Sequence, residues 1–251
     1  CRRQRQMCIR DSTETLIRVS GTTARPLAKL RQKMTALQKN LDSRQARSEA
    51  TKSALMRAAE KLIAENGVEN VSISDIVTVA KQKNQSALQY HFTNLNGLID
   101  AILETRSAET HERRATMIDE LLAANAQPSL RDICMLMVYP SFSLARESSE
   151  YHNYVKAFGH ALVLSERSLL SIVQRHGGGG ASGQQTAELL KAALPHLDPV
   201  HYQQRMEAAV RLCSASMYYQ ARQPQGFKGK QADRFLHGLV DAIVGLMSGP
   251  V

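Results

Sequence analysis

The chain has 251 residues, enough to bury a sizeable core in one large domain or two modest ones. With such a core, neither disorder nor a disulfide scaffold is needed, and the 43% hydrophobic content, the lack of Trp and the scarcity of Gly and Pro outside one patch favour an all-α fold. No apolar run approaches the roughly 18 residues that span a bilayer, and no apolar segment follows the N-terminal arginines as in a secretory signal. We therefore expect a cytoplasmic protein without membrane contact, whose four Cys residues are reduced thiols.

The net charge of +9 is concentrated near the N-terminus. Residues 1–50 hold 12 Lys and Arg against 4 Asp and Glu, whereas the remaining residues hold 20 against 19. A basic extension joined to a nearly neutral body indicates a polyanionic partner, with nucleic acid ahead of anionic lipid. The alternative is a solvated tail without a partner. We expect residues 1–47 to form a basic, disordered extension, of which residues 1–33, before Met34, lie upstream of the natural start.

Helical periodicity becomes clear after this extension. Apolar side chains recur at helical spacing over residues 55–63, and Gly67 supplies a left-handed stop after this first helix. A second helix of about two turns follows, with Ser72 or Ser74 as its N-cap and Asp75 favourably placed in its first turn.

The polar turn KQKN, at residues 81–84, precedes a third short helix over residues 85–91. A long fourth helix follows, with Thr93 or Asn94 as its cap. Three short helices with a tight turn between the second and the third are typical of a helix-turn-helix domain, which we assign to residues 48–98. The residues expected to face its core include Ile73, Ile76, Val79, Ala80 and Leu88.

The outward face of the third helix is polar, and its side chains suit the major groove of DNA. Asn and Gln pair with adenine edges and Ser bonds to several bases, while basic side chains and the polar tips of Tyr and His reach phosphates. The predicted DNA-binding residues are Arg44, Arg47, Lys52, Ser72, Ser74, Lys83, Asn84, Gln85, Ser86, Gln89, Tyr90 and His91. The alternative is a polar turn in an ordinary helical bundle.

Two stretches carry a resemblance to a known family. The segments LMRAAEKLIAENGVENVSISDIVTVAK, residues 55–81, and NQSALQYHFTNLNGLIDAIL, residues 84–103, resemble the TetR-type transcriptional regulators. That resemblance implies an all-helical homodimer whose N-terminal helix-turn-helix binds a palindromic operator, most often as a repressor. Lys81 stands where the family usually has Gly, so a non-Gly residue must carry the strain of the turn. Lys81 and Lys83 can replace the charge lost at Leu95, where the family often has a basic residue.

The resemblance also implies that residues 99–251 form a larger helical domain that binds a small effector and dimerises. The expected pocket residues, suited to an apolar or aromatic effector, are Met135, Tyr139, Phe142, Tyr154 and Phe158. All five could instead be ordinary core residues. The glycine-rich segment from Gly177 has linker composition and no phosphate-binding Gly-Lys-Ser.

The last two helical patterns predict a dimer surface, because the first has one apolar face and the last is apolar on two sides and so needs two partners. The expected interface residues are Met206, Val210, Cys213, Met217, Leu236, Val240 and Val244. The alternative is that the last helix is wholly internal to one subunit.

Signs of an enzyme are weak. The C-terminal histidines form no His-x-x-x-His or His-Glu-x-x-His pair, and no nucleophile elbow or carboxylate pair stands out, so we expect neither a metal nor another cofactor. A different class, a basic-armed RNA-binding or scaffold protein without an effector, predicts that the extension alone binds nucleic acid. We favour a dimeric, ligand-responsive DNA-binding regulator, a repressor ahead of an activator.

Overall fold

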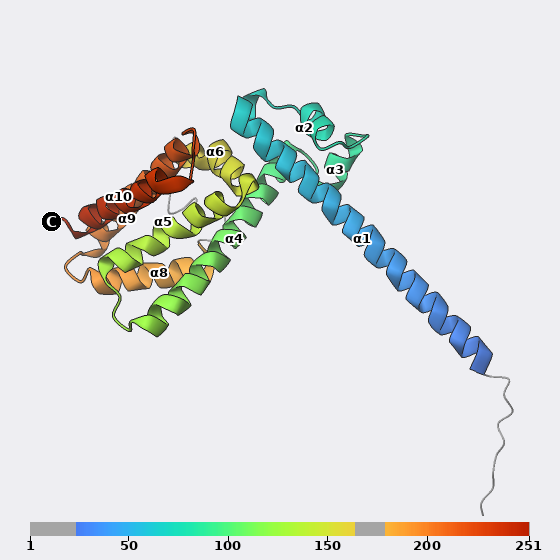
Figure 1. Cartoon of the computed structure of the whole chain (residues 1–251), viewed down its shortest axis with the longest axis horizontal. Helices are drawn as coiled ribbons and strands as arrows, with labels where there is room; N and C mark the ends of the chain where they lie inside the picture. The colour runs from blue at the N-terminus through green and yellow to red at the C-terminus, as the bar shows by residue number, and fades with distance from the viewer. Residues whose placement is uncertain (1–23, 164–178, 251) are drawn as a thin grey trace, which may run out of the picture. The chain divides into compact units, whose positions relative to one another are not determined.

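The computed structural model describes residues 24–163 and 179–250, in which all regular secondary structure is helical (Figure 1). The predicted all-α class is therefore confirmed for the described part of the chain. Residues 1–48 and residues 49–251 form two compact units, which we describe separately. None of the described helices is both long and apolar enough to cross a membrane.

The helices have the following bounds in chain order: α1 Ala24–Asn66, the 3-10 turn η1 Val68–Asn70, α2 Ile73–Val79, α3 Ser86–Phe92, α4 Leu95–Ala124, α5 Leu130–Glu147, α6 Ser149–Val163, α8 Gly180–Ala193, α9 Pro199–Ala221 and α10 Gly229–Ser248.

Helix α1 corrects one expectation from the sequence. It begins at Ala24, so residues 24–47 are helical and do not form the disordered extension that we expected. The segment is rich in Ala, Leu, Lys, Gln and Arg, which are strong helix formers, and it has no internal Gly. Its Pro26 lies in the first turn, where the missing amide proton is tolerated. Residues 1–23 lie outside the described part of the chain.

One hydrophobic core lies within the helix-turn-helix. It joins Leu55 and Ile63 of α1 to Ile76 of α2, Leu88 of α3 and Ile102 of α4, all of them nearly or fully buried. Most of the predicted inward face is confirmed, because Ile76, Ala80 and Leu88 are buried and Ile73 packs against the same cluster. Val79 is an exception. It is the last residue of α2 and is 42% exposed.

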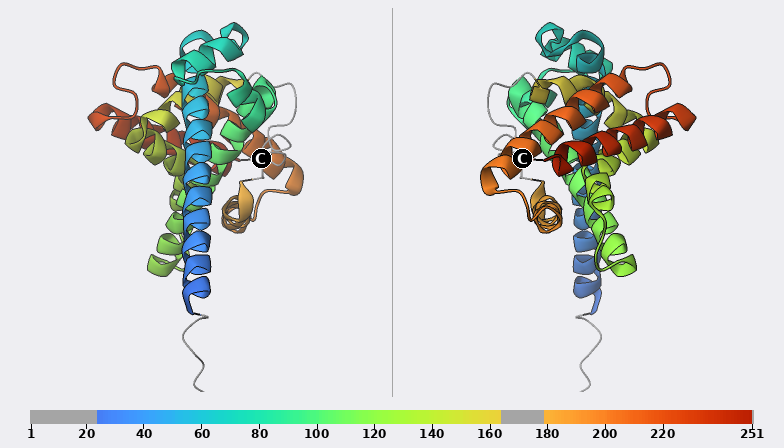
Figure 2. Two further views of the ribbon diagram at one scale, coloured as in Figure 1. Left: turned by 90° about the vertical axis from the view of Figure 1, so that its right-hand side faces the viewer. Right: turned by 90° about the vertical axis from the view of Figure 1, so that its left-hand side faces the viewer.

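A second core holds the C-terminal helices together. Phe142 of α5, Tyr151 of α6, Leu190 of α8 and Val240 of α10 belong to one buried cluster. Helix α6 packs on α9, while α10 packs on both α5 and α9, and Figure 2 shows α9 and α10 side by side. Helix α4 contributes Leu98 to the first core and packs farther along against α5 and α8. Helix α4 therefore connects the helix-turn-helix to the C-terminal helices.

Candidate functional site

A capping box fixes the start of α2. The Ser72 hydroxyl accepts a hydrogen bond from the Asp75 amide at 3.2 Å and donates to the Asp75 carboxylate at 2.6 Å, while the carboxylate also accepts from the Ser72 amide at 3.1 Å. Reciprocal bonds of this kind satisfy two amides that a helix start leaves without partners. The hydrogen bonds from Ser72 lower the pKa of Asp75. The predicted cap is confirmed, and the Ser72 hydroxyl has a structural role here.

The turn between α2 and α3 has the geometry of a Schellman motif. The Gln82 amide donates to the Val77 carbonyl at 2.9 Å, and the Lys81 amide donates to the Thr78 carbonyl at 3.0 Å. This motif needs a left-handed residue at its centre, and Lys81 takes that place with φ of 55°. The expected strain therefore lies on Lys81. The Gln82 side chain adds a bond to the Ala80 carbonyl at 3.1 Å.

Helix α3 presents one apolar and one polar face. Leu88 and Phe92, four residues apart, are buried against the first core. The Asn84 side-chain oxygen accepts from the Ser86 amide at 3.0 Å and thereby starts the helix. The exposed face carries Gln85, Ser86, Gln89 and Tyr90. Tyr90 is 82% exposed, far more than an aromatic residue that packs in the core of its own domain.

The junction of α3 and α4 explains a motif glycine. Thr93, with φ of 67° and ψ of −50°, lies at the centre of a γ-turn in which the Asn94 amide donates to the Phe92 carbonyl at 2.7 Å. Asn94 then caps α4 by accepting from the Gly97 amide at 2.9 Å. A Cβ on Gly97 would lie 2.1 Å from the Phe92 carbonyl oxygen, so no larger residue fits. Gly97 therefore allows the start of α4 to lie close to the end of α3.

The other predicted DNA-binding residues differ in their surroundings. Ser74 and Lys83 are exposed, whereas Lys52 and His91 are only half-buried. Arg44 and Arg47 are exposed on the part of α1 that belongs to the first unit, and Arg47 donates to the Ser43 carbonyl at 3.0 Å. Their role in DNA binding stays a prediction.

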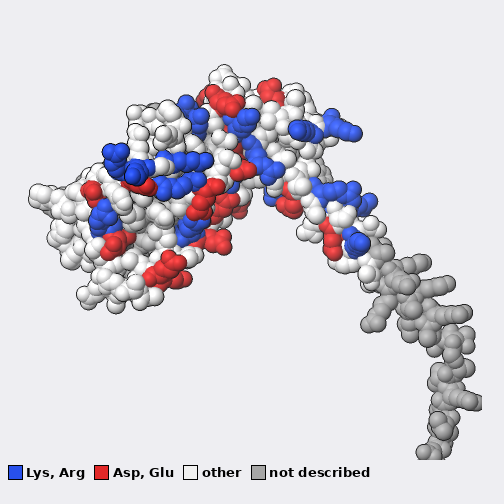
Figure 3. Space-filling view, viewed as in Figure 1, with Lys and Arg blue, Asp and Glu red and all other residues white. Residues whose placement is uncertain are grey.

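Positive charge is distributed unevenly along the chain. Residues 49–98 hold five Lys and Arg and five Asp and Glu, whereas residues 24–48 hold seven Lys and Arg and one Asp. On the face that Figure 3 shows, both signs are interspersed over the C-terminal helices. Residues 24–48 of α1 therefore attract a polyanion most strongly. The polar turn offers only individual cations, such as Lys81 and Lys83.

The C-terminal helices enclose a cavity of about 500 Å³. Its wall is mainly apolar, and residues of α4, α5, α6, α8 and α9 contribute to it. The apolar lining residues are Met137, Val138, Val155, Phe158, Ala187, Leu190, Met206, Val210 and Met217, and the polar ones include Arg114, Ser141, Tyr151, Tyr154, Gln184, Thr186, Lys191, Tyr202, Cys213 and Ser214. This volume is typical of sites for small organic molecules.

Two of the five predicted pocket residues, Tyr154 and Phe158, line this cavity. The other three do not. Phe142 is fully buried against Phe227 and Phe235 in the core, and Tyr139 on the same helix is 37% exposed. Met135 also packs against that core. The apolar pattern of α5 indicates which face of the helix is buried, but it cannot distinguish a residue in a packed core from one that lines a cavity.

The predicted dimer residues have neighbours within the subunit, and their role in an interface stays a prediction. Met206, Val210, Cys213 and Met217 line the cavity inside the subunit. Leu236 and Val240 are buried in the subunit's own core, against which Val244 also packs. The predicted apolar face of α9 lines a cavity within its own subunit, which the sequence pattern cannot distinguish from a partner subunit.

Arg114 is the main site residue that the sequence did not reveal. It lies on α4, within the sequence HERRA of residues 111–115. No group of three or more His, Cys, Asp or Glu among the described residues is arranged to hold a metal ion. Burial raises the pKa of Cys134 to about 11 and of Cys213 to about 12, so both are protonated thiols at neutral pH.

The chain is similar to several solved structures. A Rhodococcus sp. protein classed as a TetR-family transcriptional regulator matches with a TM-score of 0.51 and 19% identity, over 77% of this chain and 98% of its own. GusR of Salmonella enterica matches with a TM-score of 0.46 and 20% identity, over 78% and 95%. A transcriptional regulator of Streptomyces coelicolor A3(2) gives 0.40 and 18%, over 79% and 98%.

No protein-family model and no curated protein matches the sequence. The Rhodococcus structure shows that the chain has the fold of the TetR-type regulators, as the sequence resemblance implied.

Proposed function

We propose that the protein is a ligand-responsive DNA-binding transcriptional regulator that acts as a homodimer and represses at a palindromic operator. The observation that carries the proposal is the combination, in one chain, of an exposed polar α3 and a mainly apolar cavity, with α4 contributing to both regions. An enzyme would need reactive groups gathered in the cavity, whereas its wall is mainly apolar.

DNA recognition rests on α3 and the turn before it. Gln85 and Gln89 are one helical turn apart on the exposed face, where their amides can pair with adenine edges in the major groove. Lys81, Lys83 and Tyr90 are exposed beside them and suit phosphate contacts. The basic residues of α1, including Arg44 and Arg47, add affinity that does not depend on base sequence.

Dimerisation uses the exposed side of α10 in place of the buried residues that we first expected. Gly238, Ala242 and Gly245 lie on that side at helical spacing. A Cβ on Gly238 or Gly245 would meet no described atom of the subunit within 4 Å, so the subunit's own packing does not require glycine there. Small residues allow a second helix to approach closely, as in a four-helix bundle formed by two subunits.

The effector occupies the cavity and has a largely apolar or aromatic body. Tyr154 and Phe158 line one side of the cavity, and Met206 and Met217 of α9 also line it. A ligand changes DNA affinity only if it binds two conformations of the protein unequally, with a typical effect of about 5- to 150-fold.

The test is to select DNA bound by the full chain from a random pool. We expect a palindrome whose half-sites are about one helical turn, roughly 34 to 36 Å, apart. An asymmetric site or an absence of sequence preference would contradict the proposal. The alternative, a basic-armed nucleic-acid-binding or scaffold protein without an effector, predicts that residues 1–48 alone retain the full affinity.

A further inference from the structure

Arg114, a cation in the cavity wall, has no acidic partner among the residues that the structure describes. The Arg114 Nε donates to the Leu136 carbonyl at 3.1 Å, and its Nη1 lies 3.5 Å from the Gly179 carbonyl. No carboxylate among residues 24–163 and 179–250 forms an ion pair with it. The preceding residue, Arg113, differs sharply, because its guanidinium binds both oxygens of Glu147 at 2.9 and 2.6 Å.

The rest of the wall reinforces this positive character. Lys191 is a second cation of the lining, and no described lining residue is Asp or Glu. Burial lowers the pKa of Arg114, while the nearby Tyr151 and Cys213 oppose that shift. A partly buried guanidinium to which no described carboxylate is bound is unfavourable, and a bound anion relieves that cost.

We propose that the cavity binds an organic monoanion, namely a carboxylate with an apolar alkyl or aryl body, whose head binds the Arg114 guanidinium. The planar guanidinium of Arg114 offers two parallel N–H donors, which match a carboxylate. The apolar wall, including Val155, Phe158 and Met217, covers the body of the ligand. This inference rests on the proposed function, since it names the class of effector for the same cavity.

The test compares ligands of one shape and different charge. Calorimetry with the full chain, without DNA, would use decanoate, decanol and decyl phosphate, followed by 2-naphthoate and 2-naphthol. We expect each carboxylate to bind at least about tenfold more tightly than its alcohol, as charge-assisted bonds exceed neutral ones. Decyl phosphate, which is mostly dianionic at neutral pH, tests the choice of head group. Tighter binding of decyl phosphate than of decanoate would overturn the assignment to a carboxylate. Equal affinity of acid and alcohol, or no binding of either carboxylate, would overturn the proposal.

Variants locate the effect. Arg114→Gln should abolish the preference for acid over alcohol and leave the affinity for decanol within about threefold, whereas Arg114→Lys should keep part of the preference because it keeps the charge. Arg113→Gln is the matched control, on the same helix but paired with Glu147 and absent from the cavity wall. Thermal unfolding of each variant verifies that it is folded. A preference that survives in Arg114→Gln would contradict the assignment.

His111 gives an independent readout. Burial and then the charge of Arg114 lower its pKa. Decanoate bound to Arg114 should raise the His111 pKa in NMR titrations, whereas decanol should not, and an unchanged pKa with decanoate would overturn the proposal. If decanoate binds as expected but leaves operator affinity unchanged, the effector function fails while this site stands. If a neutral ligand alone releases DNA, the reverse holds.

Discussion

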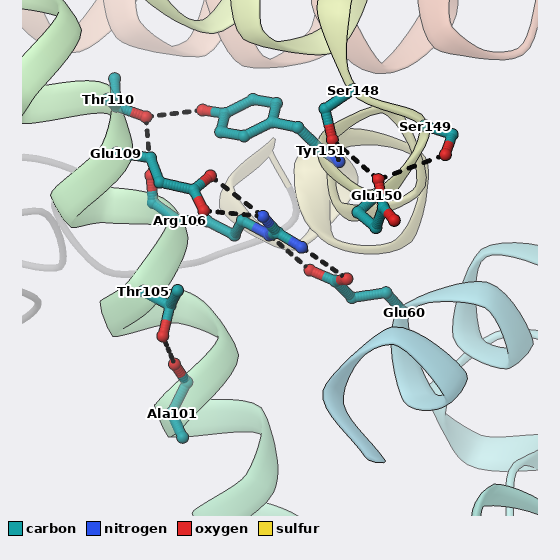
Figure 4. A network of polar contacts seen from close by, with 10 residues as sticks. All are labelled: Glu60, Ala101, Thr105, Arg106, Glu109, Thr110, Ser148, Ser149, Glu150 and Tyr151. Carbon is teal, nitrogen blue, oxygen red and sulfur yellow. Dashed lines mark hydrogen bonds and ion pairs between the residues drawn. The ribbon is translucent and has the colours of Figure 1, made fainter. Parts of the chain in front are cut away.

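Arg106 of α4 binds the buried carboxylate of Glu60 of α1 through two hydrogen bonds, of 2.7 and 2.9 Å (Figure 4). Its remaining terminal nitrogen donates to both oxygens of Glu109, at 2.9 and 3.0 Å. The Glu60 side chain has no exposed surface, and that of Arg106 is 11% exposed. Burial alone would lower the pKa of Arg106, but its bonds to Glu60 and Glu109 raise it. The pair therefore ties the first helix of the helix-turn-helix to α4.

We predict that Arg106→Leu lowers the free energy of unfolding by about 3 to 5 kcal/mol, because it leaves Glu60 buried without a partner. The double variant with Glu60→Leu should lose much less, since it removes both charges. Arg131→Leu, which breaks the exposed pair with Asp241, should cost at most about 1 kcal/mol. Urea unfolding measures all three. A double variant as unstable as Arg106→Leu would show that the pair is not coupled.

The same region connects the cavity to α4. Tyr151 lines the cavity, and its hydroxyl shares a hydrogen bond of 2.6 Å with the Thr110 hydroxyl, one turn beyond Arg106 on α4 (Figure 4). The Thr110 hydroxyl also donates to the Arg106 carbonyl at 2.8 Å. A ligand that moves Tyr151 therefore acts on the helix segment that holds Glu60. We offer this as the physical basis for coupling between the effector and DNA.

Tyr151→Phe tests that coupling. It keeps the ring in the wall but removes the bond to Thr110, so the ligand-induced change in operator affinity should fall from the typical 5- to 150-fold range toward about one. Tyr154→Phe is the control, because it removes a hydroxyl from the same helix and the same cavity. Operator binding by fluorescence anisotropy, with and without effector, provides the measurement. A full response in Tyr151→Phe would rule out this route.

Dimerisation can be tested at α10 without harming the subunit. Gly245→Arg places a long side chain on the exposed face and should shift the protein to monomers in analytical ultracentrifugation, with loss of operator binding. Gly245→Ala is the control, and it should stabilise the helix by about 0.5 to 1 kcal/mol while leaving the dimer intact. If Gly245→Arg remains a dimer, the interface lies elsewhere.

Sequence patterns predicted the helix-turn-helix well because its signals are local. The Ser72 cap, the strain at Lys81 and the buried Leu88 each depend on residues a few positions apart. The C-terminal site depends on which helices meet. Met206 and its neighbours have the periodicity of an interface, yet they line a cavity. The sequence around Arg114 does not reveal that Arg113 binds Glu147 while Arg114 has no carboxylate partner among the described residues.

Base recognition should depend on Gln85. Its position at the start of α3 and its exposure predict that Gln85→Ala costs about 1 to 3 kcal/mol of specific binding while nonspecific binding is nearly unchanged. Lys83→Ala should instead weaken both kinds of binding and lower the salt dependence, as expected for a phosphate contact. Competition assays with operator and random DNA distinguish them. Equal losses on both DNAs for Gln85→Ala would mean that it only positions the helix.

Lys81 has a left-handed backbone conformation, which glycine adopts with less strain, and it is also a predicted phosphate contact. A non-Gly residue in this conformation costs about 1 to 2 kcal/mol, part of which the greater freedom of an unfolded glycine would offset. Lys81→Gly should therefore stabilise the protein by up to about 1 kcal/mol. If the Lys81 ammonium contacts a phosphate, the same change should lower the slope of log K against log salt by about 0.9 and weaken operator binding.

The control for this last change separates charge from strain. Lys81→Asn also removes the charge, but Asn tolerates the left-handed region better than Lys does. It should therefore match Lys81→Gly in the salt dependence of operator binding and gain less stability in urea unfolding. An unchanged salt slope in both variants would show that Lys81 does not contact DNA. A loss of stability in Lys81→Gly would show that the lysine side chain itself stabilises the turn.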